Sequence, residues 1–324
     1  MIAGLAVVAY AGGNVEVALS TLFLNPITTS GGVEQIFVRF VVFYTMAMGI
    51  GIALKAGLWN IGAQGQLIVG MLMVFVAYTY MAFLPWPVLY VSMILLATLG
   101  GLLWIVVPAV LRIKFGANEI VVTLLLNVVA TNFGYYMLNG PIKSAQAVGY
   151  PYTATLPAKF QIPQILNGVP ITYAVPFTVA LGVVLYFLVE KTSFRLKADT
   201  VGESTETAKY AGINIPRVMV ITMLSAGALA GLAGATLQMG YLYHIDAGSF
   251  GTNFGFIAVI AALVGRKHMI GIGIASLFFA YMTIGAEAMA LLSNVTTSVV
   301  FAMEGVMMIG ILLSAFLAER RDRT

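Results

Sequence analysis

The chain has 324 residues, of which 60% are hydrophobic and only 9% are charged, and its mean hydropathy is +0.98. Because soluble domains carry about 25% charged residues, this composition excludes a water-soluble globular protein and predicts an all-α integral membrane protein of the cell membrane. The net charge of +4 does not indicate a nucleic-acid partner, because the basic residues are spread between apolar stretches, and membrane lipid is the expected surrounding.

Apolar stretches long enough to cross a bilayer, about 20 residues, give the order of the spans. They are expected at 33–54, 58–84, 86–111, 117–139, 172–190, 217–240, 254–265, 269–292 and 297–317, with the stretch at 254–265 short for a span. Ahead of them, MIAGLAVVAYAGG is expected to be the tail of a longer span or a half-inserted segment, followed by a small outer element at 15–32. The sequence therefore predicts one transmembrane domain, 1–324, that is a helical bundle of about ten segments, the first of them short.

The basic residues give the orientation of this bundle. When the sides alternate from span to span, every Lys and Arg except Arg39, Lys143 and Lys159 falls on one side. Cytoplasmic loops carry an excess of these residues, so the C-terminus and residues 191–216 are expected in the cytoplasm and the outer loop, 140–171, on the opposite face. The outer loop is rich in proline and is expected to be irregular or short-helical; it either only connects two spans or docks an outside partner.

An uncharged polar stretch at 56–72, AGLWNIGAQGQLIVGML, interrupts the apolar pattern. Asn60 and Gln64 are four residues apart and would share one face of a helix. We expect Asn60, Gln64 and the nearby Gln66 to face a solute pathway or a seam between helices rather than lipid. Residues 247–263 again place Gly, Thr and Asn before an apolar run, but from the opposite side, which is the pattern of an inverted repeat.

The span at 117–139 has a polar stripe at four-residue spacing, which puts its side chains on one helical face. Its members are Glu119, Thr123, Asn127, Thr131 and Tyr135. We interpret the stripe, above all Thr123, Asn127 and Thr131, as the lining of a solute pathway, with hydrogen bonding between helices as the alternative. For Asn118 and Glu119 the alternative to lining the pathway is to cap the N-terminus of this helix.

Two acidic residues fall inside predicted spans, where a charge costs roughly 2.5–3.5 kcal/mol. Glu304 and Glu287 would either line a solute pathway or be neutral acids that hydrogen-bond a neighbouring helix, and we assign Glu304 to the pathway. In another span, Gly227, Gly231 and Gly234 recur at helix-contact spacing and are expected to pack helices closely.

No pattern typical of a catalytic or metal site stands out. The sequence contains no G-x-x-x-x-G-K-[ST] phosphate loop, no G-x-S-x-G elbow and no H-E-x-x-H helix. His244 and Asp246 form an H-x-D, but the chain has only two histidines and no cysteine, so we expect no metal site. The sequence indicates a protein that is not an enzyme.

The cytoplasmic segment 191–216 contains ETAKYAG, an E-x-A-x-x-x-G pattern of Glu206, Ala208 and Gly212. Ser204 is a suitable N-cap for a short exposed helix that ends at Gly212. This helix would either fit a groove of a soluble partner or be an ordinary amphipathic linker.

The E-x-A-x-x-x-G element resembles the coupling helix of ABC importer permeases. GLWNIGAQGQLIVG, FGANEIVVTLLLN, AGALAGLAGA and GFIAVIAALVG resemble, in that order, the motifs of the branched-chain amino acid/ribose/nucleoside permease family, from about residue 40 to the C-terminus. The resemblance implies the ABC importer permease fold. It also implies an ATPase-coupling role for the element, with contacts from Glu206, Ala208, Lys209, Tyr210 and Gly212.

The same resemblance implies the partners and the substrate. Two ABC ATPase subunits would use ATP and Mg²⁺, so no cofactor is expected in this chain. A second permease subunit, often a different chain, would complete the pathway, and an extracytoplasmic substrate-binding lipoprotein would deliver the solute. The long outer loop and GANEIVVTLLLN most resemble permeases for nucleosides, with a simple sugar such as ribose or glucose as the alternative. Glu304 departs from the glutamine that relatives tend to have.

Two other functions stay open on the residues alone. One is an ion-coupled secondary transporter with Glu304 and Glu287 as proton or sodium sites, against which the E-x-A-x-x-x-G element argues. The other is a membrane scaffold without transport activity, in which the polar stripe would be dispensable.

Overall fold

The computed structural model describes residues 15–165, 171–292 and 310. Throughout these residues the regular structure is helical, with two isolated β-bridges and no named strand. Seven of the described helices are long and apolar enough to cross a membrane, or up to eight if the bent pair Ala174–Glu190 and Ser193–Glu203 is one span. The predicted all-α membrane fold is confirmed, and this count is roughly consistent with about ten segments in the whole chain.

The described elements follow one another in a simple order. They are α2 (Val15–Thr28), α3 (Gly32–Lys55), α4 (Ala63–Tyr80), α5 (Trp86–Phe115), α6 (Glu119–Asn139), η1 (Ala158–Phe160), α7 (Ala174–Leu185), η2 (Tyr186–Glu190), α8 (Ser193–Glu203), α9 (Thr205–Tyr210), α10 (Ile215–Leu237), η3 (Gln238–Leu242), η4 (Ala247–Phe250), α11 (Phe254–Val264) and α12 (Met269–Leu292). The π-helices η2 and η3 directly continue α7 and α10.

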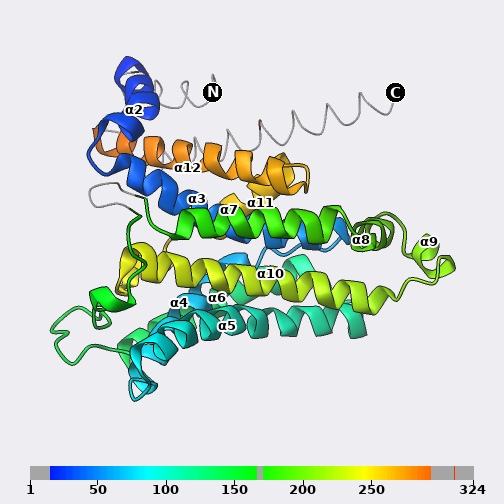
Figure 1. Ribbon diagram of the computed structural model, residues 1–324, viewed down its shortest axis with the longest axis horizontal. Helices are drawn as coiled ribbons and strands as arrows, with labels where there is room; N and C mark the ends of the chain where they lie inside the picture. Colours follow the sequence, from blue (N-terminus) through cyan, green and yellow to red (C-terminus); the bar gives the residue numbers. More distant parts are fainter. Residues whose placement is uncertain (1–14, 166–170, 293–309, 311–324) are drawn as a thin grey trace.

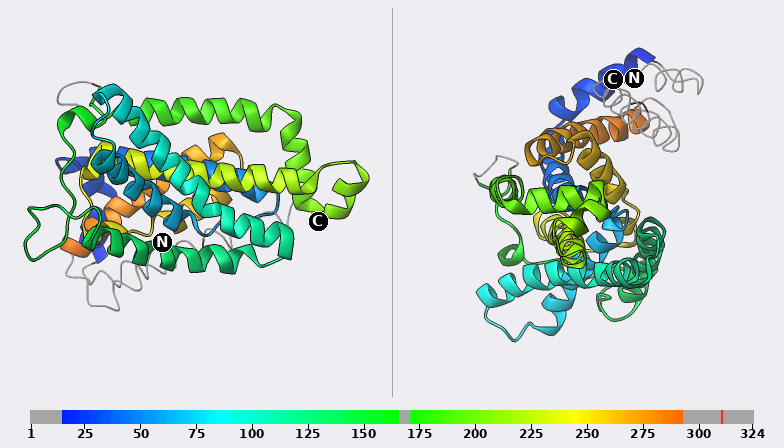
Figure 2. Two further views of the ribbon diagram at one scale, coloured as in Figure 1. Left: turned by 90° about the horizontal axis from the view of Figure 1, so that it is seen from below. Right: turned by 90° about the vertical axis from the view of Figure 1, so that its right-hand side faces the viewer.

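The long helices lie side by side along the long axis, with the loop at 140–165 at one end and α8 and α9 at the other (Figure 1). The view from below shows that α8 and α9 project beyond the ends of the long helices (Figure 2). The central helix is α3, because 83% of its apolar window is buried inside the protein, against 33% for α5 and 28% for α6. Helices α5 and α6 therefore turn most of their apolar surface outward, towards lipid or a partner subunit.

Glycines let α10 approach its neighbours closely. A Cβ atom at Gly227 would lie 2.6 Å from a backbone oxygen of α5, and one at Gly231 would lie 2.3 Å from another. At Gly234 it would lie 2.4 Å from a backbone oxygen of α4. Because interiors are close-packed, no larger side chain fits at these crossings unless the backbones move apart. The glycines at helix-contact spacing thus lie where α10 crosses α4 and α5.

The helix within the predicted span 58–84 begins later than expected. Residues 56–62 are not helical, and α4 begins at Ala63. Gly57 has a φ of +72°, a conformation that glycine adopts without steric cost. The predicted span 58–84 therefore consists of a non-helical entry followed by α4, because the apolar content of a stretch does not report such a break. The predicted span 297–317 and Glu304 lie outside the described residues.

Within its described residues, 140–165 and 171, the outer loop is irregular apart from η1, as its proline content predicts. Its backbone is tied to the chain that follows η3. Tyr152 forms a bridge with Asp246, and the N–H of Thr153 donates to the carbonyl oxygen of Ile245 at 3.0 Å. The outer loop is therefore fixed to the segment that leads into α11.

Candidate functional site

The non-helical segment 56–62 carries the chain from the end of α3 into the interior of the bundle. The backbone N–H of Trp59 donates to Glu119 Oε1 at 3.4 Å, and the N–H of Gly65, in the first turn of α4, donates to Asn127 Oδ1 at 2.8 Å. Since Asn127 lies about 12 Å along α6 from the first residue of that helix, α4 begins inside the bundle. The amide of Asn127 also donates to the carbonyl oxygen of Ile61 at 2.9 Å.

Asn60 and Gln66 form a reciprocal amide pair at this break. The Nδ2 of Asn60 donates to Gln66 Oε1 at 2.9 Å, and the Nε2 of Gln66 donates to Asn60 Oδ1 at 3.0 Å. The same Asn60 oxygen accepts the backbone N–H of Gly62 at 3.1 Å. Both side chains are 1% exposed, and a buried amide is costly unless it is hydrogen-bonded. The pairing therefore stabilises a break that an apolar sequence could not maintain.

Gln64 joins the start of α4 to the start of α11. Its Oε1 accepts the backbone N–H of Gly255 at 2.8 Å, and its Nε2 donates to Thr252 Oγ1 at 3.0 Å. The first N–H groups of a helix have no partner within the helix, so this side chain satisfies one of them in α11. A Cβ atom at Gly255 would lie 2.4 Å from the backbone nitrogen of Gln64, so only glycine permits the contact. We name the group at this junction the polar seam: Asn60, Gln64, Gln66, Asn127, Thr252 and Gly255.

The polar seam brings together the two segments whose sequences were compared as an inverted repeat, 56–72 and 247–263. One follows α3, whose last residue, Lys55, lies beside Gly202 of α8, and the other follows the segment that is tied to the outer loop. The two broken segments thus reach the polar seam from opposite ends of the bundle. The sequence spacing identified Asn60 and Gln64 as candidate site residues, but no local sequence signal predicted that Gln64 would contact Gly255.

The remaining members of the polar stripe on α6 bond mainly within their own helix. The hydroxyl of Thr123 donates to the carbonyl oxygen of Glu119 at 2.6 Å, and the hydroxyl of Thr131 donates to the backbone carbonyl oxygen of Asn127 at 3.0 Å. The ring of Tyr135 packs edge-on against Phe250 of η4. These residues thus make contacts within α6 and with η4, and the assignment of the stripe to a solute pathway stays a prediction.

The acidic groups at the helix ends are paired with cations. Glu119 lies 3.3 Å from Arg112, and the side chain of Asn118 accepts the N–H of Ile120 as an N-cap. Glu287 forms an ion pair with Arg39 of α3, and its side chain is 55% exposed. The two earlier interpretations of Glu287, a pathway lining or a neutral acid on a neighbouring helix, omitted this pairing because the partners are far apart in sequence.

The segment 191–216, which is expected in the cytoplasm, forms two helices, α8 and α9, where the sequence predicted one. Ser204 accepts the N–H of Thr207 at 3.2 Å as the N-cap of α9. Gly212 follows the helix with a φ of +69°. Ala208 is buried, whereas Tyr210 is 90% exposed, and Glu206 and Lys209 are exposed as well. Helix α9 therefore packs through one small side chain and presents its polar and aromatic groups outward.

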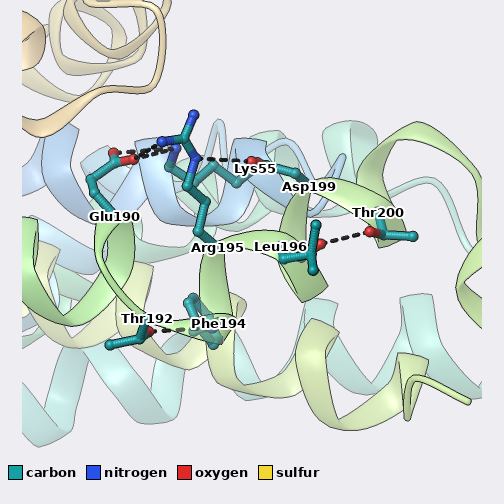
Figure 3. Close-up of polar contacts among 8 residues, drawn as sticks. All are labelled: Lys55, Glu190, Thr192, Phe194, Arg195, Leu196, Asp199 and Thr200. Carbon is teal, nitrogen blue, oxygen red and sulfur yellow. Dashed lines mark hydrogen bonds and ion pairs between the residues drawn. The ribbon is translucent and has the colours of Figure 1, made fainter. Parts of the chain in front are cut away.

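A charge network that the sequence did not reveal connects α8 to the end of α3 (Figure 3). Lys55 Nζ lies 3.2 Å from Glu190 Oε1, and their side chains are 6% and 2% exposed. Arg195 of α8 lies 3.6 Å from the same carboxylate and 3.4 Å from Asp199. We name Lys55, Glu190, Arg195 and Asp199 the charge network. The signal that could have suggested it is an acidic residue, Glu190, at the C-terminal end of an apolar span.

The backbones also meet at this point. A Cβ atom at Gly202 of α8 would lie 2.2 Å from the carbonyl oxygen of Lys55 and 2.8 Å from the nitrogen of Gly57. Helix α8 is therefore held directly against the residues that begin the non-helical segment 56–62. These few residues join the polar seam to α8.

A membrane bundle with broken helices at a polar junction, and a pair of short helices projecting from one end, is the architecture of a transport protein. The chain belongs to the family described as the branched-chain amino acid transport system / permease component, which matches residues 32–319. It is a multi-pass membrane permease of the ABC transporter class, a transport subunit and not an enzyme. Permeases of this class work with ATPase and substrate-binding partners.

Curated relatives cover most of the chain. The glucose ABC transporter permease protein TsgB13 of Haloferax volcanii is 30% identical over 94% of this chain and 82% of its own length. The guanosine ABC transporter permease protein NupP of Bacillus subtilis is 29% identical over 78% and 73%. The nucleoside ABC transporter permease protein NupB of Lactococcus lactis is 23% identical over 83% and 76%. A solved inward-facing metal-chelate type ABC transporter matches with a TM-score of 0.42 and 15% identity, covering 87% of this chain and 85% of that one.

Proposed function

We propose that this chain is one permease subunit of an ATP-driven importer and that it carries a nucleoside across the cell membrane. The observation that carries the proposal is the family match over residues 32–319, together with relatives named as guanosine and nucleoside permeases. A simple sugar is the alternative substrate, favoured by the relative named as a glucose permease. The ion-coupled and scaffold hypotheses have no support from these relatives.

The proposal assigns ATPase docking to α9. This helix lies at the projecting end of the molecule (Figure 1), and its Tyr210 is 90% exposed, so it is available to fill an apolar pocket of a soluble partner. The ATPase subunits would bind ATP and Mg²⁺, and this chain would bind neither. A second permease chain and an extracytoplasmic binding lipoprotein complete the proposed assembly, with the C-terminus in the cytoplasm.

Docking is tested by Tyr210→Ala, which removes an exposed side chain and should leave the fold intact. After co-expression with the ATPase, we expect the variant to retain at least tenfold less ATPase subunit on affinity purification and to lose uptake. The matched control is Tyr150→Ala, which removes an exposed tyrosine of the outer loop. Full retention of the ATPase by both Tyr210→Ala and Gly212→Arg would show that the docking assignment is wrong.

The proposed pathway runs through the polar seam, and a single thiol tests it. Because the chain contains no cysteine, Gln64→Cys would carry the only thiol in the protein. Gln64 is 5% exposed, so we expect slow reaction with a charged, water-soluble maleimide at rest and at least tenfold faster reaction during ATP hydrolysis by the complete importer. An equal rate with and without ATP, or labelling by a lipid-soluble reagent alone, would contradict the pathway assignment.

A further inference from the structure

A cavity of about 240 Å³ lies on the outer side of the polar seam. It is lined by the outer part of α3, the end of α10 with η3, and the segment from Asp246 to the first residue of α11. Its polar lining residues are Gln35, Arg39, Tyr241, Asp246, Ser249 and Thr252. Its lining thus comes from two regions of the chain that are far apart in sequence, 35–39 and 237–254.

Hydrogen-bonding capacity is left over on this lining. Among the described residues, neither the amide of Gln35 nor the hydroxyl of Tyr241 has a hydrogen-bond partner, although both line the cavity. The Oδ1 of Asp246 accepts the N–H and the hydroxyl of Ser249 at 2.9 and 2.8 Å, and its Oδ2 is unused within the same residues. Thr252 Oγ1 accepts from Gln64 and keeps its own proton to donate. Donors and acceptors of both kinds are therefore available to a solute.

The charges around the cavity favour a neutral solute. Arg39 is paired with Glu287 and its side chain is 12% exposed, so its charge is already balanced. Asp246 adds a carboxylate to the lining, and a carboxylate repels anions while it accepts hydrogen bonds from sugar hydroxyls, as in dinucleotide sites. An uncharged molecule that carries several hydroxyls matches this arrangement better than a phosphorylated one.

The size and the walls of the cavity set the shape of the solute. Binding sites for drug-sized ligands occupy about 300–1,000 Å³, so about 240 Å³ holds roughly one ring with its substituents. The apolar and aromatic lining residues are Val38, Leu237, Tyr241, Leu242 and Phe254. They suit the C–H face of a sugar ring, while the polar residues suit its hydroxyls.

We propose that this cavity binds the sugar ring of the transported solute, either the ribose of a nucleoside or a simple sugar, within a single permease subunit. The proposal rests on the proposed function and adds a specific site to it. The floor of the cavity is Thr252, which bonds Gln64 of the polar seam, and Asp246 on its wall is bridged to Tyr152 of the outer loop. A solute in the cavity would therefore contact Asp246, which is bridged to the outer loop, and Thr252, which lies at the junction of α4 with α11.

Equilibrium binding to the complete permease–ATPase complex in lipid nanodiscs, without the binding lipoprotein, tests the site. The probes are radiolabelled adenosine, ribose, glucose and adenosine monophosphate at concentrations up to the millimolar range. We expect one of the three neutral solutes to bind and the phosphorylated one to bind at least tenfold more weakly. Binding of adenosine alone would identify a nucleoside site, and binding of ribose or glucose would identify a sugar site.

Four variants separate the cavity from the rest of the protein. Gln35→Leu and Tyr241→Leu should weaken binding about tenfold or more, because each removes a donor or acceptor that the bound sugar ring would use. Tyr241→Phe keeps the packing of the ring and should weaken binding by a smaller factor. The matched control is Asn139→Leu, because Asn139 is exposed on α6 and bonds only its own helix.

The outcomes distinguish the site from the proposed function. A wild-type complex that imports adenosine or glucose with its lipoprotein and ATP, but binds none of the probes alone, would overturn the site and leave the function standing. Unchanged binding in both leucine variants, or tighter binding of adenosine monophosphate, would do the same. A complex that imports none of the neutral probes would overturn the proposed function itself.

Discussion

The polar seam and the charge network lie at the two ends of one short segment, 56–66, but they are built from different chemistry. The polar seam consists of neutral amides and one hydroxyl that bond one another and the first N–H groups of α4 and α11. The charge network consists of full charges, and its central pair, Lys55 and Glu190, is buried. A neutral hydrogen bond contributes about 0.5–1.5 kcal/mol net, whereas removing one partner of a buried ion pair costs about 3–5 kcal/mol.

This difference indicates what each region is suited to do. Amides at the polar seam can exchange protein partners for water or solute without exposing a charge to an apolar medium. The charge network keeps α8 attached to the end of α3, because separating Lys55 from Glu190 would leave charges without partners in the interior. Movement of α8 and α9 would therefore be transmitted through the charge network to the polar seam, where contacts are easier to break. Four substitutions test this contrast.

The largest effect is expected from Glu190→Leu. This change leaves Lys55 buried without its counter-ion, and we expect a loss of about 3–5 kcal/mol in stability and loss of ATP-driven uptake. Thermal unfolding in detergent, followed by tryptophan fluorescence, measures the stability. The double variant Lys55→Met/Glu190→Leu should recover most of the loss, and a double variant as unstable as the single one would show that ion pairing is not the cause.

Gly255→Ala is expected to have the next largest effect, through sterics at the polar seam. The new methyl group would lie 2.4 Å from the backbone nitrogen of Gln64, so α11 must move away from α4. Overpacking of this kind typically costs about 1–3 kcal/mol. The control is Gly251→Ala, where the nearest atom would be 3.5 Å away; equal loss of uptake in both variants would contradict the need for close contact at Gly255.

Asn127→Leu tests the hydrogen bonds of the polar seam. It leaves the N–H of Gly65 and the carbonyl oxygen of Ile61 unpaired, which costs about 1–3 kcal/mol. Its control, Asn132→Leu, replaces an exposed asparagine that bonds only its own helix. If the pathway assignment is right, uptake falls further than the loss of folded protein accounts for. Normal uptake by Asn127→Leu would contradict the assignment of this residue to the pathway.

The smallest effect is expected from Asp199→Asn. The pair with Arg195 is partly exposed, 36% and 53%, and exposed ion pairs are worth about 0.2–1 kcal/mol. The loss should be smaller still at 1 M salt, where the Debye length is about 3 Å. A loss comparable to that of Glu190→Leu would show that the outer part of the charge network matters as much as the buried pair.

Much of the fold follows from local sequence. The predicted spans 86–111, 117–139, 254–265 and 269–292 match the observed helices to within a few residues, because length and apolar content decide what can cross a bilayer. Prediction was weaker in the segment 191–216. Helix α8 was missed because its sequence, SFRLKADTVGE, contains no apolar stretch that would indicate a helix.

The site was predictable only in part. Asn60, Gln64 and Asn127 were identified because a polar side chain in an apolar span needs an explanation. Their partners were not, because Gln64 and Gly255 are 191 residues apart. The buried pair of Lys55 and Glu190 was hidden for the same reason, being 135 residues apart.

The sequence by itself determined that the chain spans a membrane, where its helices lie, and which polar residues the bilayer would not tolerate without a partner. These properties depend on the free energy of placing each side chain in an apolar medium, which is a local quantity. Only the tertiary structure decided that α4 and α11 meet at their first turns, that α8 is fastened to α3, and that a cavity with unused hydrogen-bonding groups lies beside the polar seam. Contacts of this kind depend on how distant helices pack, and the close approach of Gly255 to Gln64 shows how far a single glycine can determine that packing.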